Sequence, residues 1–368
     1  MSRVEKLQAD STCFIKVKTH PVKKSFMYQL LTIFCSSFQT ETPIFFIGVL
    51  ILSMFLGFYL LTKGGDLLSD HCSNLANAIG IPSVVVGLTV VSIATSAPEL
   101  FTSIAAVNSG ATGLILGNII GSNIANIGLI LGISLIISPI NTEKAVSSTQ
   151  SILLLTLSCT FIGYLFFHPS HSLNIISGSI LLIFIFSYLF FISKNALRNR
   201  KTNNFVTSKS SNAEDNINTP IHISCVMVFV ATTALWIGSD SLVFGAKNLA
   251  NLVGVPEELV GFTLVAIGTS LPELAASISL TRKKEFGMLL GNIVGSNMFN
   301  IGLVGGVAGV LSPITVSTAY PWIDYISLLL LTGVLAIWLK GKYLQKSHGV
   351  TLLILYISAS TVTWIYNS

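Results

Sequence analysis

The chain of 368 residues is 52% apolar and only 10% charged, and its mean hydropathy is +0.78. Soluble globular domains carry about 25% charged residues, so this composition excludes a water-soluble protein and indicates an integral membrane protein. The net charge of +5 therefore reflects the placement of loops and does not indicate binding of nucleic acid.

The N-terminal tail, residues 1–43, contains six basic residues, and its apolar patch at 26–38 is short and interrupted. One interpretation is that the native chain starts at Met27, which would remove all six basic residues. The alternatives are a peripheral amphipathic tail and an eleventh span. Mass spectrometry of the intact N-terminus distinguishes them, because a peptide from residues 2–24 excludes the start at Met27.

Ten apolar runs follow the tail, and each is close to the length of about 17–25 residues that a membrane-spanning helix needs. The spans are predicted near residues 44–62, 82–107, 113–138, 151–168, 172–193, 221–245, 257–281, 286–311, 322–339 and 350–367. The five cysteines are scattered without a CxxC or pairing pattern, so we interpret them as isolated thiols.

A polar stretch, residues 194–220, is the only long hydrophilic break after residue 44, and it divides the spans into five and five. Because five is odd, the second half enters the membrane from the opposite side. The sequence therefore predicts an all-α membrane protein of about ten transmembrane helices in two inverted-topology five-helix repeats, residues 44–193 and 221–368.

Basic residues near the ends of the spans predict the orientation. If residues 194–220 are cytoplasmic, thirteen basic residues lie inside, and beyond the tail only Lys247 lies outside. We therefore predict a basic cytoplasmic linker at 194–220, both termini outside, and a location in the bacterial inner (plasma) membrane. The linker is too short for a folded Ca²⁺-sensing domain.

Two sequence motifs occur twice at one constant offset in residue number. GLTVVSIATSAPE at 87–99 returns as GFTLVAIGTSLPE at 261–273, and GNIIGSNIANIGL at 117–129 returns as GNIVGSNMFNIGL at 291–303. The repeat offset is the same for both motifs, since 261 − 87 = 174 and 291 − 117 = 174. Each copy contains one acid, Glu99 or Glu273, inside an apolar segment where an unneeded charge would be costly. A duplicated pair of buried acids indicates a pathway for cations.

Each acid follows a proline, Pro98 or Pro272. A proline inside a helix removes one N–H donor and frees the carbonyl four residues earlier. Hydroxyls three and four residues before the acid lie on its face of a helix. Each copy thus supplies a carboxylate, two hydroxyls and a carbonyl, a set of oxygen donors that suits Ca²⁺ or Na⁺ and not soft metals. The predicted donors are Thr95, Ser96, Glu99 and the carbonyl of Ala94 in the first copy, and Thr269, Ser270, Glu273 and the carbonyl of Gly268 in the second.

The second motif carries two glycines at GxxxG spacing, which allows close helix packing, and a Ser/Asn pair one turn apart. The packing glycines are Gly117, Gly121, Gly291 and Gly295. The Ser/Asn pairs, Ser122 with Asn126 and Ser296 with Asn300, are predicted to line the ion site; hydrogen bonds between helices are the alternative. Asp66 and Asp240, which the repeat offset also relates, are expected to have a structural or helix-end role, and His168 and His171 to face solvent.

The duplicated motifs resemble the two repeats of the cation/Ca²⁺ exchanger superfamily, and within it the prokaryotic sodium/calcium-exchanger-like proteins. The resemblance implies ten helices in two inverted halves, with the repeat helices around the ions and two lateral helices that slide to alternate access. It also implies an ion-binding set of Ser92 (through its carbonyl), Thr95, Ser96, Glu99, Ser122, Asn126, Ala266 (through its carbonyl), Thr269, Ser270, Glu273, Ser296 and Asn300.

The sequence departs from that family at Asn300, where well-studied prokaryotic exchangers have an aspartate. Two carboxylates balance one Ca²⁺ or two Na⁺, and a third Na⁺ would leave one positive charge uncompensated. Unit charges about 5 Å apart interact by roughly 3 kcal/mol at an effective dielectric of about 20. The departure puts an exchange of three Na⁺ for one Ca²⁺ in doubt.

The sequence therefore predicts a secondary antiporter that exchanges Ca²⁺ for Na⁺, with no enzymatic activity and no cofactor. Its expected partners are inorganic cations and membrane lipid, without nucleic acid or an obligate protein partner. Exchange of the cation for protons on the same fold remains the alternative, because carboxylates in such a site can carry protons. The repeat argues against a channel, the lack of a nucleophile–base motif against an enzyme, and the lack of Cys and His in the repeats against heavy-metal transport.

Overall fold

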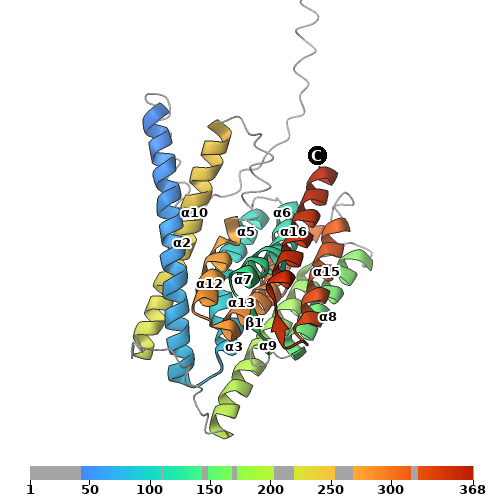
Figure 1. Cartoon of the computed structure of the whole chain (residues 1–368). Coiled ribbons are helices and arrows are strands. Elements are labelled where there is room, and N and C mark those ends of the chain that lie inside the picture. Colours follow the sequence, from blue (N-terminus) through green and yellow to red (C-terminus); the bar gives the residue numbers. More distant parts are fainter. Residues whose placement is uncertain are drawn as a thin grey trace, which may run out of the picture.

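The computed structural model describes residues 43–108, 112–142, 148–167, 172–202, 219–252, 268–315 and 322–367, and these are almost entirely helical (Figure 1). The helices of the first half are α2 (Pro43–Ile79), α3 (Ser83–Val86), η2 (Gly87–Val91), α4 (Ser92–Thr95), α5 (Ala97–Asn108), α6 (Thr112–Ala125), η3 (Asn126–Leu131), α7 (Gly132–Ile137), α8 (Ser148–Phe167) and α9 (Ile175–Thr202). Those of the second half are α10 (Ile221–Leu252), α12 (Leu271–Arg282), α13 (Phe286–Phe299), η4 (Asn300–Val304), α14 (Gly305–Leu311), α15 (Trp322–Trp338) and α16 (Lys346–Asn367). The all-α prediction is confirmed; the segments named η are π-helical turns within longer helices.

Each predicted span coincides with one helix or with a run of consecutive helical pieces, although the seventh, residues 257–281, is described only from residue 268 onward. By length and hydropathy, six helices of the described residues could cross a membrane, and seven if the bent pair Ser83–Thr95 and Ala97–Asn108 forms one span. Three predicted spans do not meet these criteria of length and hydropathy. They correspond to α12, a short helix in a span of which only a part is described, to α15, which has 17 residues, and to α16, which begins with the polar sequence KSHG.

The first helix is longer than the sequence analysis predicted. The predicted span ends at residue 62, whereas α2 continues to Ile79. It ends at Gly80, whose φ of 69° is readily adopted only by glycine. Asp66, predicted near the end of its span, therefore lies inside α2, and Asp240 lies inside α10; both are half-buried.

The helix of the fifth predicted span, residues 172–193, also extends beyond its prediction. Helix α9 continues to Thr202, so the first part of the predicted linker is helical. Residues 203–218 of that linker lie outside the described residues. The same holds for residues 1–42, which include the alternative start at Met27, and for the loop with His168 and His171.

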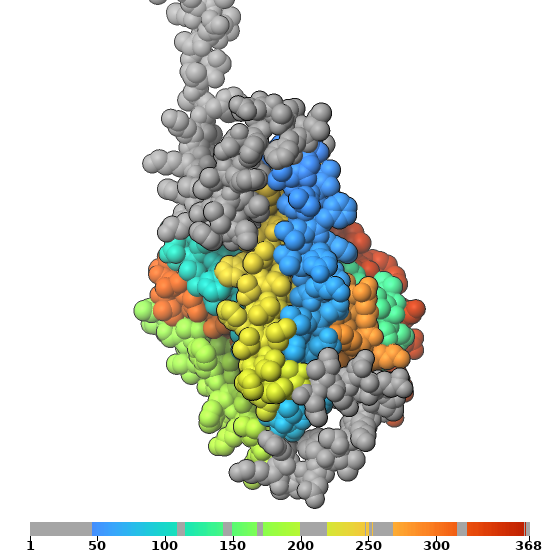
Figure 2. All heavy atoms as spheres, turned by 90° about the vertical axis from the view of Figure 1, so that its left-hand side faces the viewer, coloured from blue at the N-terminus to red at the C-terminus, as the bar shows by residue number. Residues whose placement is uncertain are grey.

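Helices α2 and α10 lie side by side as a long antiparallel pair at one edge of the molecule (Figures 1 and 2). Their backbones are in contact, since a Cβ atom added to Gly57 would lie 2.6 Å from the backbone nitrogen of Leu242 and 2.7 Å from the carbonyl oxygen of Gly238. Helix α2 also packs on α12, where a Cβ added to Gly65 would lie 2.7 Å from Ala275 O. Helices α2 and α10 thus pack closely against each other, and α2 also packs closely against α12.

Polar contacts of Asp66 strengthen the joint between α2 and α12. Ser279 Oγ donates a hydrogen bond to Asp66 Oδ1 at 2.7 Å, and Lys283 Nζ donates to the carbonyl oxygen of Asp66 at 2.9 Å. Lys283 also forms an ion pair with Asp70 at 2.7 Å. These contacts support the structural role that the sequence analysis favoured for Asp66.

Two short antiparallel strand pairs connect the halves. Strand β1 (Ile140–Asn141) pairs with β4 (Tyr343–Leu344), and β2 (Ser172–Leu173) pairs with β3 (Ile314–Thr315). The first strands of the two halves, β1 and β3, begin at residues that the repeat offset relates, since 314 − 140 = 174. Each pair therefore joins a connection of one half to a connection of the other, as expected for two related halves that fold together.

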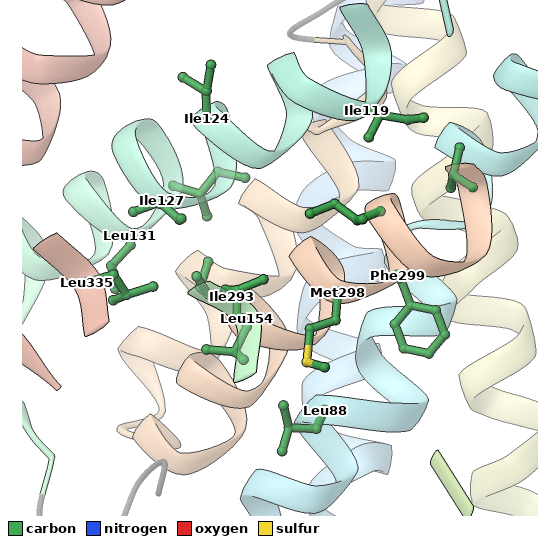
Figure 3. Packing of buried hydrophobic residues seen from close by; sticks show 14 of the residues in the cluster. Leu88, Ile119, Ile124, Ile127, Leu131, Leu154, Ile293, Met298, Phe299 and Leu335 are labelled. Carbon is green, nitrogen blue, oxygen red and sulfur yellow. The ribbon is translucent and has the colours of Figure 1, made fainter. Parts of the chain in front are cut away.

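The centre of the bundle is α13, in which every residue from Met288 to Phe299 is buried. Figure 3 shows how its apolar side chains pack among those of neighbouring helices, including Ile293, Met298, Phe299, Leu88, Ile119, Ile124, Ile127, Leu131, Leu154 and Leu335. Large apolar side chains on outer helices are instead exposed, for example Phe55 at 70% and Phe229 at 72%. A helix that is apolar all round is buried, and exposed apolar faces in a chain of this composition face lipid.

Candidate ion-binding site

A break in the helix precedes each of the two repeated acids. Helix α4 ends at Thr95, Ser96 has non-helical angles (φ −85°, ψ 5°), and α5 begins at Ala97, with a bend of 42° between the two parts. Ser270 has nearly the same angles (φ −90°, ψ 3°) before α12. Proline is tolerated in the first turn of a helix, where its missing N–H has no intrahelical partner. Pro98 and Pro272 therefore start new helices, and each acid lies in a first turn.

Glu99 and Glu273 are buried, with exposed fractions of 1% and 0% for the whole residues. Their carboxyl groups lie close enough to interact electrostatically. Ser96 Oγ donates a hydrogen bond to Glu273 Oε1 at 3.1 Å. Among the described residues, no donor reaches the other oxygen of Glu273 or either carboxylate oxygen of Glu99. Two buried carboxylates with so few donors are stable only when a cation or a proton balances their charge.

The hydroxyl groups beside the acids reach across to the other half, which the sequence analysis did not predict. It placed Thr95 and Ser96 beside Glu99 on one helix face. In the structure Ser96 contacts Glu273, and Thr95 Oγ1 donates toward Asn292 Oδ1 at 3.3 Å as well as Val91 O at 3.1 Å. The reason is the unwound turn at Ser96, which changes the helical phase between the hydroxyls and the acid.

Two asparagines that the sequence analysis missed join this polar centre, Asn118 on α6 and Asn292 on α13. Thr269 Oγ1 donates to Asn118 Oδ1 at 3.3 Å, as Thr95 does to Asn292. Each asparagine directly follows the first glycine of the second motif, in the sequence GNI. The repeat offset relates the two asparagines, since 292 − 118 = 174. That repetition of a polar residue inside an apolar helix was the signal that could have found them.

The four predicted Ser/Asn positions are all buried, with exposures of 0–2%. Ser122 Oγ donates to Asn118 Oδ1 at 3.5 Å and Ser296 Oγ to Asn292 Oδ1 at 3.3 Å. A π-helical turn begins at Asn126 in η3 and at Asn300 in η4. Such turns are frequent at functional sites.

The two asparagines at the π-helical turns differ in their contacts. Asn126 Nδ2 donates to Asn297 Oδ1 at 3.0 Å, a hydrogen bond between the halves. Asn300 is fully buried, yet within the described part of the chain neither Oδ1 nor Nδ2 has a hydrogen-bond partner. Asn126 thus forms the hydrogen bond between helices that was the alternative in the sequence analysis, and its Oδ1 has no partner among these residues.

The backbone carbonyl groups predicted as ion ligands differ from one another in their hydrogen bonds. The carbonyl of Ser92 accepts a hydrogen bond from the Ser96 N–H at 2.9 Å. The carbonyl of Gly268, freed by Pro272, accepts one from Ser239 Oγ on α10, so it is not the open donor that was expected. Ala266 lies outside the described residues.

Two of the four glycines of the second motif, Gly291 and Gly295, lie against α3 and η2 of the first half. A Cβ atom added to Gly291 would lie 2.5 Å from the carbonyl oxygen of Val84, and one added to Gly295 would lie 3.0 Å from the backbone of Leu88. Gly117 and Gly121 have no atom of the described residues within 4 Å of an added Cβ. The segment that corresponds to residues 84–92 in the second half, 258–266, is not described.

The donor atoms of this centre are all hard oxygens. The described residues contain no group of three or more His, Cys, Asp or Glu side chains that could hold a metal ion. What the site offers instead is two carboxylates together with serine and threonine hydroxyls and asparagine amide oxygens. Hard cations such as Ca²⁺ and Na⁺ are bound by oxygens of these kinds, whereas soft metals prefer thiolate or imidazole.

Comparison with known proteins gives one matching family. The profile of the family described as "Sodium/calcium exchanger protein" matches residues 49–194 and 223–365. The chain is 30% identical over 341 residues to the sodium/calcium exchanger MaX1 of Methanosarcina acetivorans, which covers 85% of this chain and 97% of that protein. It is also 30% identical to the inner membrane protein YrbG of Escherichia coli strain K12, covering 85% and 94% of the two chains.

Solved structures show the same similarity over the whole fold. A structure of the sodium-calcium exchanger NCX_Mj soaked with 10 mM Na⁺ and 10 mM Sr²⁺ superposes with a TM-score of 0.72 at 30% identity, covering 86% of this chain and 98% of that one. The match covers both halves, so the arrangement of two repeats predicted from the sequence is confirmed at the level of the fold.

Proposed function

We propose that this chain, which belongs to the sodium/calcium exchanger protein family, is a secondary antiporter that exchanges Ca²⁺ for Na⁺ by alternating access. The observation that supports this most is the pair of buried carboxylates, Glu99 and Glu273, one from each half. Together they supply two negative charges at the boundary between the halves, and they balance one Ca²⁺ or two Na⁺.

The same pair of acids explains why the protein would exchange one cation for another and would not let cations leak across the membrane. Without a cation, Glu99 and Glu273 repel each other in a buried site, so the empty carrier is strained when water is excluded from it. Either cation relieves this repulsion. The protein therefore changes conformation more readily when loaded, and Ca²⁺ movement is coupled to return of the counter-ion.

We assign the ion-binding role to oxygen atoms of both repeats, as the sequence analysis proposed. The burial of the described members of this set and the hydrogen bond from Ser96 to Glu273 support this assignment, and Ala266 is included from the resemblance alone. The proposed ligands are Ser92, Thr95, Ser96, Glu99, Ser122 and Asn126 from the first half, and Ala266, Thr269, Ser270, Glu273, Ser296 and Asn300 from the second.

The test is uptake of radiolabelled Ca²⁺ into proteoliposomes that contain the purified protein. We expect uptake when Na⁺ is inside and diluted outside, and none when choline replaces Na⁺. Size-exclusion chromatography shows whether the protein is folded. If folded protein takes up Ca²⁺ at a rate that does not depend on the Na⁺ gradient, Na⁺ is rejected as the coupling ion.

Proton coupling is the second candidate, and the environment of Glu99 favours it. Both of its carboxylate oxygens are buried without a donor from the described residues, so a proton could balance its charge as well as a cation does. A parallel set of proteoliposomes with a pH gradient and no Na⁺ separates the two. Uptake in this set alone would make the chain a Ca²⁺/H⁺ antiporter.

Asn300 bears on how many charges move in each cycle. Since it is neutral, we expect wild-type exchange to be electroneutral, with at most two Na⁺ for one Ca²⁺. Asn300→Asp adds a third carboxylate, which interacts with a cation about 5 Å away by roughly 3 kcal/mol, and should allow a third Na⁺ to bind.

The corresponding measurement is Na⁺-driven Ca²⁺ uptake at membrane potentials set by K⁺ and valinomycin. Wild-type uptake should not depend on the potential, whereas uptake by Asn300→Asp should. A wild-type rate that changes with the potential as strongly as that of the variant would show that Asn300 does not limit the stoichiometry.

The protein is integral to the membrane, and we propose the bacterial inner (plasma) membrane as its location. Supporting this is its similarity to a protein named as an inner membrane protein of E. coli. The distribution of basic residues supports a cytoplasmic linker at 194–220 with both termini outside. Cysteine labelling of positions in the linker, in intact and in opened cells, tests this orientation.

A further inference from the structure

One asparagine of each half, Asn118 and Asn292, lies where the halves meet. We propose that these two asparagines are positioning residues of the cation site. Each amide oxygen takes up hydroxyl hydrogens so that the hydroxyl lone pairs can face a cation, and each amide nitrogen fixes the helix that carries a glutamate. The inference rests on the proposed function, because it concerns the hydroxyls that would coordinate the ion.

Asn118 uses both ends of its amide. Its Oδ1 accepts hydrogen bonds from Thr269 Oγ1 at 3.3 Å and from Ser122 Oγ at 3.5 Å. Its Nδ2 donates to Ser103 Oγ at 3.0 Å and to the backbone carbonyl of Glu99 at 3.2 Å. An asparagine amide has two hydrogens to donate and two lone pairs with which to accept, so the capacity of this amide is filled.

Asn292 repeats this pattern with the halves exchanged. Its Oδ1 accepts from Thr95 Oγ1 and from Ser296 Oγ, both at 3.3 Å, and its Nδ2 donates to Ser277 Oγ at 3.4 Å. The single hydrogen of the Thr95 hydroxyl is shared between Asn292 Oδ1 and the carbonyl oxygen of Val91 at 3.1 Å. The partners are those of Asn118 moved by the repeat offset, and Asn292 is fully buried. Three equivalent hydrogen bonds on each side indicate a feature of the repeat and not of one helix.

The chemistry of the hydroxyl group explains what this arrangement does. A hydroxyl has one hydrogen and two lone pairs. It can coordinate a cation only when the hydrogen points elsewhere, and Oδ1 of an asparagine is such an acceptor. In each set, one hydroxyl comes from the same helix as the asparagine and one from the other half, so the amide orients oxygen donors of both halves together.

Only an amide can fill this position. An aspartate would accept from the two hydroxyls, but it has no hydrogen to donate to Ser103 or to the carbonyl of Glu99, and it would add a charge beside the two glutamates. A leucine of similar size would neither accept nor donate. The Nδ2 of Asn118 donates to Ser103 and to the carbonyl of Glu99, which both belong to α5, so the nitrogen also determines where the first turn of that helix lies relative to α6.

The test uses Asn118→Leu in the proteoliposome assay, with the apparent KM for Ca²⁺ and the maximal rate measured separately. We expect the KM to rise by about tenfold or more, the effect of one lost hydrogen bond to a buried polar group, with a smaller change in the maximal rate. The matched control is Asn123→Leu on the same helix. Asn123 is fully buried and donates to Ile119 O of its own helix at 2.9 Å, so this variant should keep the wild-type KM.

A second background shows whether Asn118 acts through the hydroxyls. In Thr269→Val the threonine hydroxyl is absent, so adding Asn118→Leu should raise the KM by a smaller factor than it does in wild type. An equal factor in both backgrounds would overturn the proposal, and so would an unchanged KM in folded Asn118→Leu or an equal rise in Asn123→Leu. If Asn118→Leu is not recovered folded, Asn118→Ala and Asn292→Leu carry the same test.

The wild-type measurement separates this inference from the proposed function. Wild-type protein that takes up no Ca²⁺ under any gradient would reject the proposed function, and the positioning role would fall with it. Wild-type uptake together with a KM that is insensitive to Asn118 and Asn292 would reject the positioning role alone.

Discussion

Replacing Glu99 or Glu273 by glutamine is expected to abolish Ca²⁺ transport while leaving the protein folded. Glutamine has nearly the same shape but removes one of the two negative charges that balance the ion. A unit charge about 5 Å from a cation contributes roughly 3 kcal/mol at an effective dielectric of about 20, which is more than a hundredfold in affinity. The repulsion between the two acids is lost at the same time, so stability should not fall.

The measurement is initial Ca²⁺ uptake by Glu99→Gln and Glu273→Gln in Na⁺-loaded proteoliposomes, normalised to the amount of folded protein. Glu285→Gln is the matched control, because Glu285 lies in the turn before α13, outside the proposed ion site. It should transport at the wild-type rate. Normal uptake by either of the first two variants would exclude that acid as an ion ligand.

The second large effect is expected at Gly291, where α13 contacts the first half. A Cβ atom at this position would lie 2.5 Å from the carbonyl oxygen of Val84 and 3.0 Å from the backbone nitrogen of Leu88. These are backbone atoms of α3 and η2, so no side chain can rotate away to make room. Gly291→Ala must separate the two helices, at a cost of about 1–3 kcal/mol or more.

Thermal unfolding of the purified protein in detergent tests this expectation. Gly163→Ala on α8 is the control, since no described atom lies within 4 Å of a Cβ there and alanine favours a helix more than glycine does. Its Tm should equal or exceed that of wild type, whereas Gly291→Ala should unfold at lower temperature or fail to assemble. Equal Tm values for both variants would mean that α13 and η2 do not pack as closely as in the structure.

The positions of the membrane helices could be predicted from the sequence, but their ends could be predicted only where the composition of the chain changes from apolar to polar. The apolar runs located a helix in each of the ten predicted spans, the seventh described only from residue 268 onward, because hydropathy is a property of consecutive residues. The same signal ended α2 at residue 62, although backbone hydrogen bonding continues to Ile79. Residues after 62 are polar enough to resemble a loop, yet Gly65 and Asp66 are held in the helix by contacts with α12, which no local pattern contains.

The sequence by itself determined the class of protein, the two related halves and the two central acids. A constant repeat offset and a carboxylate inside an apolar run are both visible along the chain, and each has a direct physical meaning. The tertiary structure alone decided which groups meet. Ser96 contacts Glu273, and Thr95 and Thr269 reach Asn292 and Asn118, because these contacts depend on how two halves, far apart in sequence, are packed against each other.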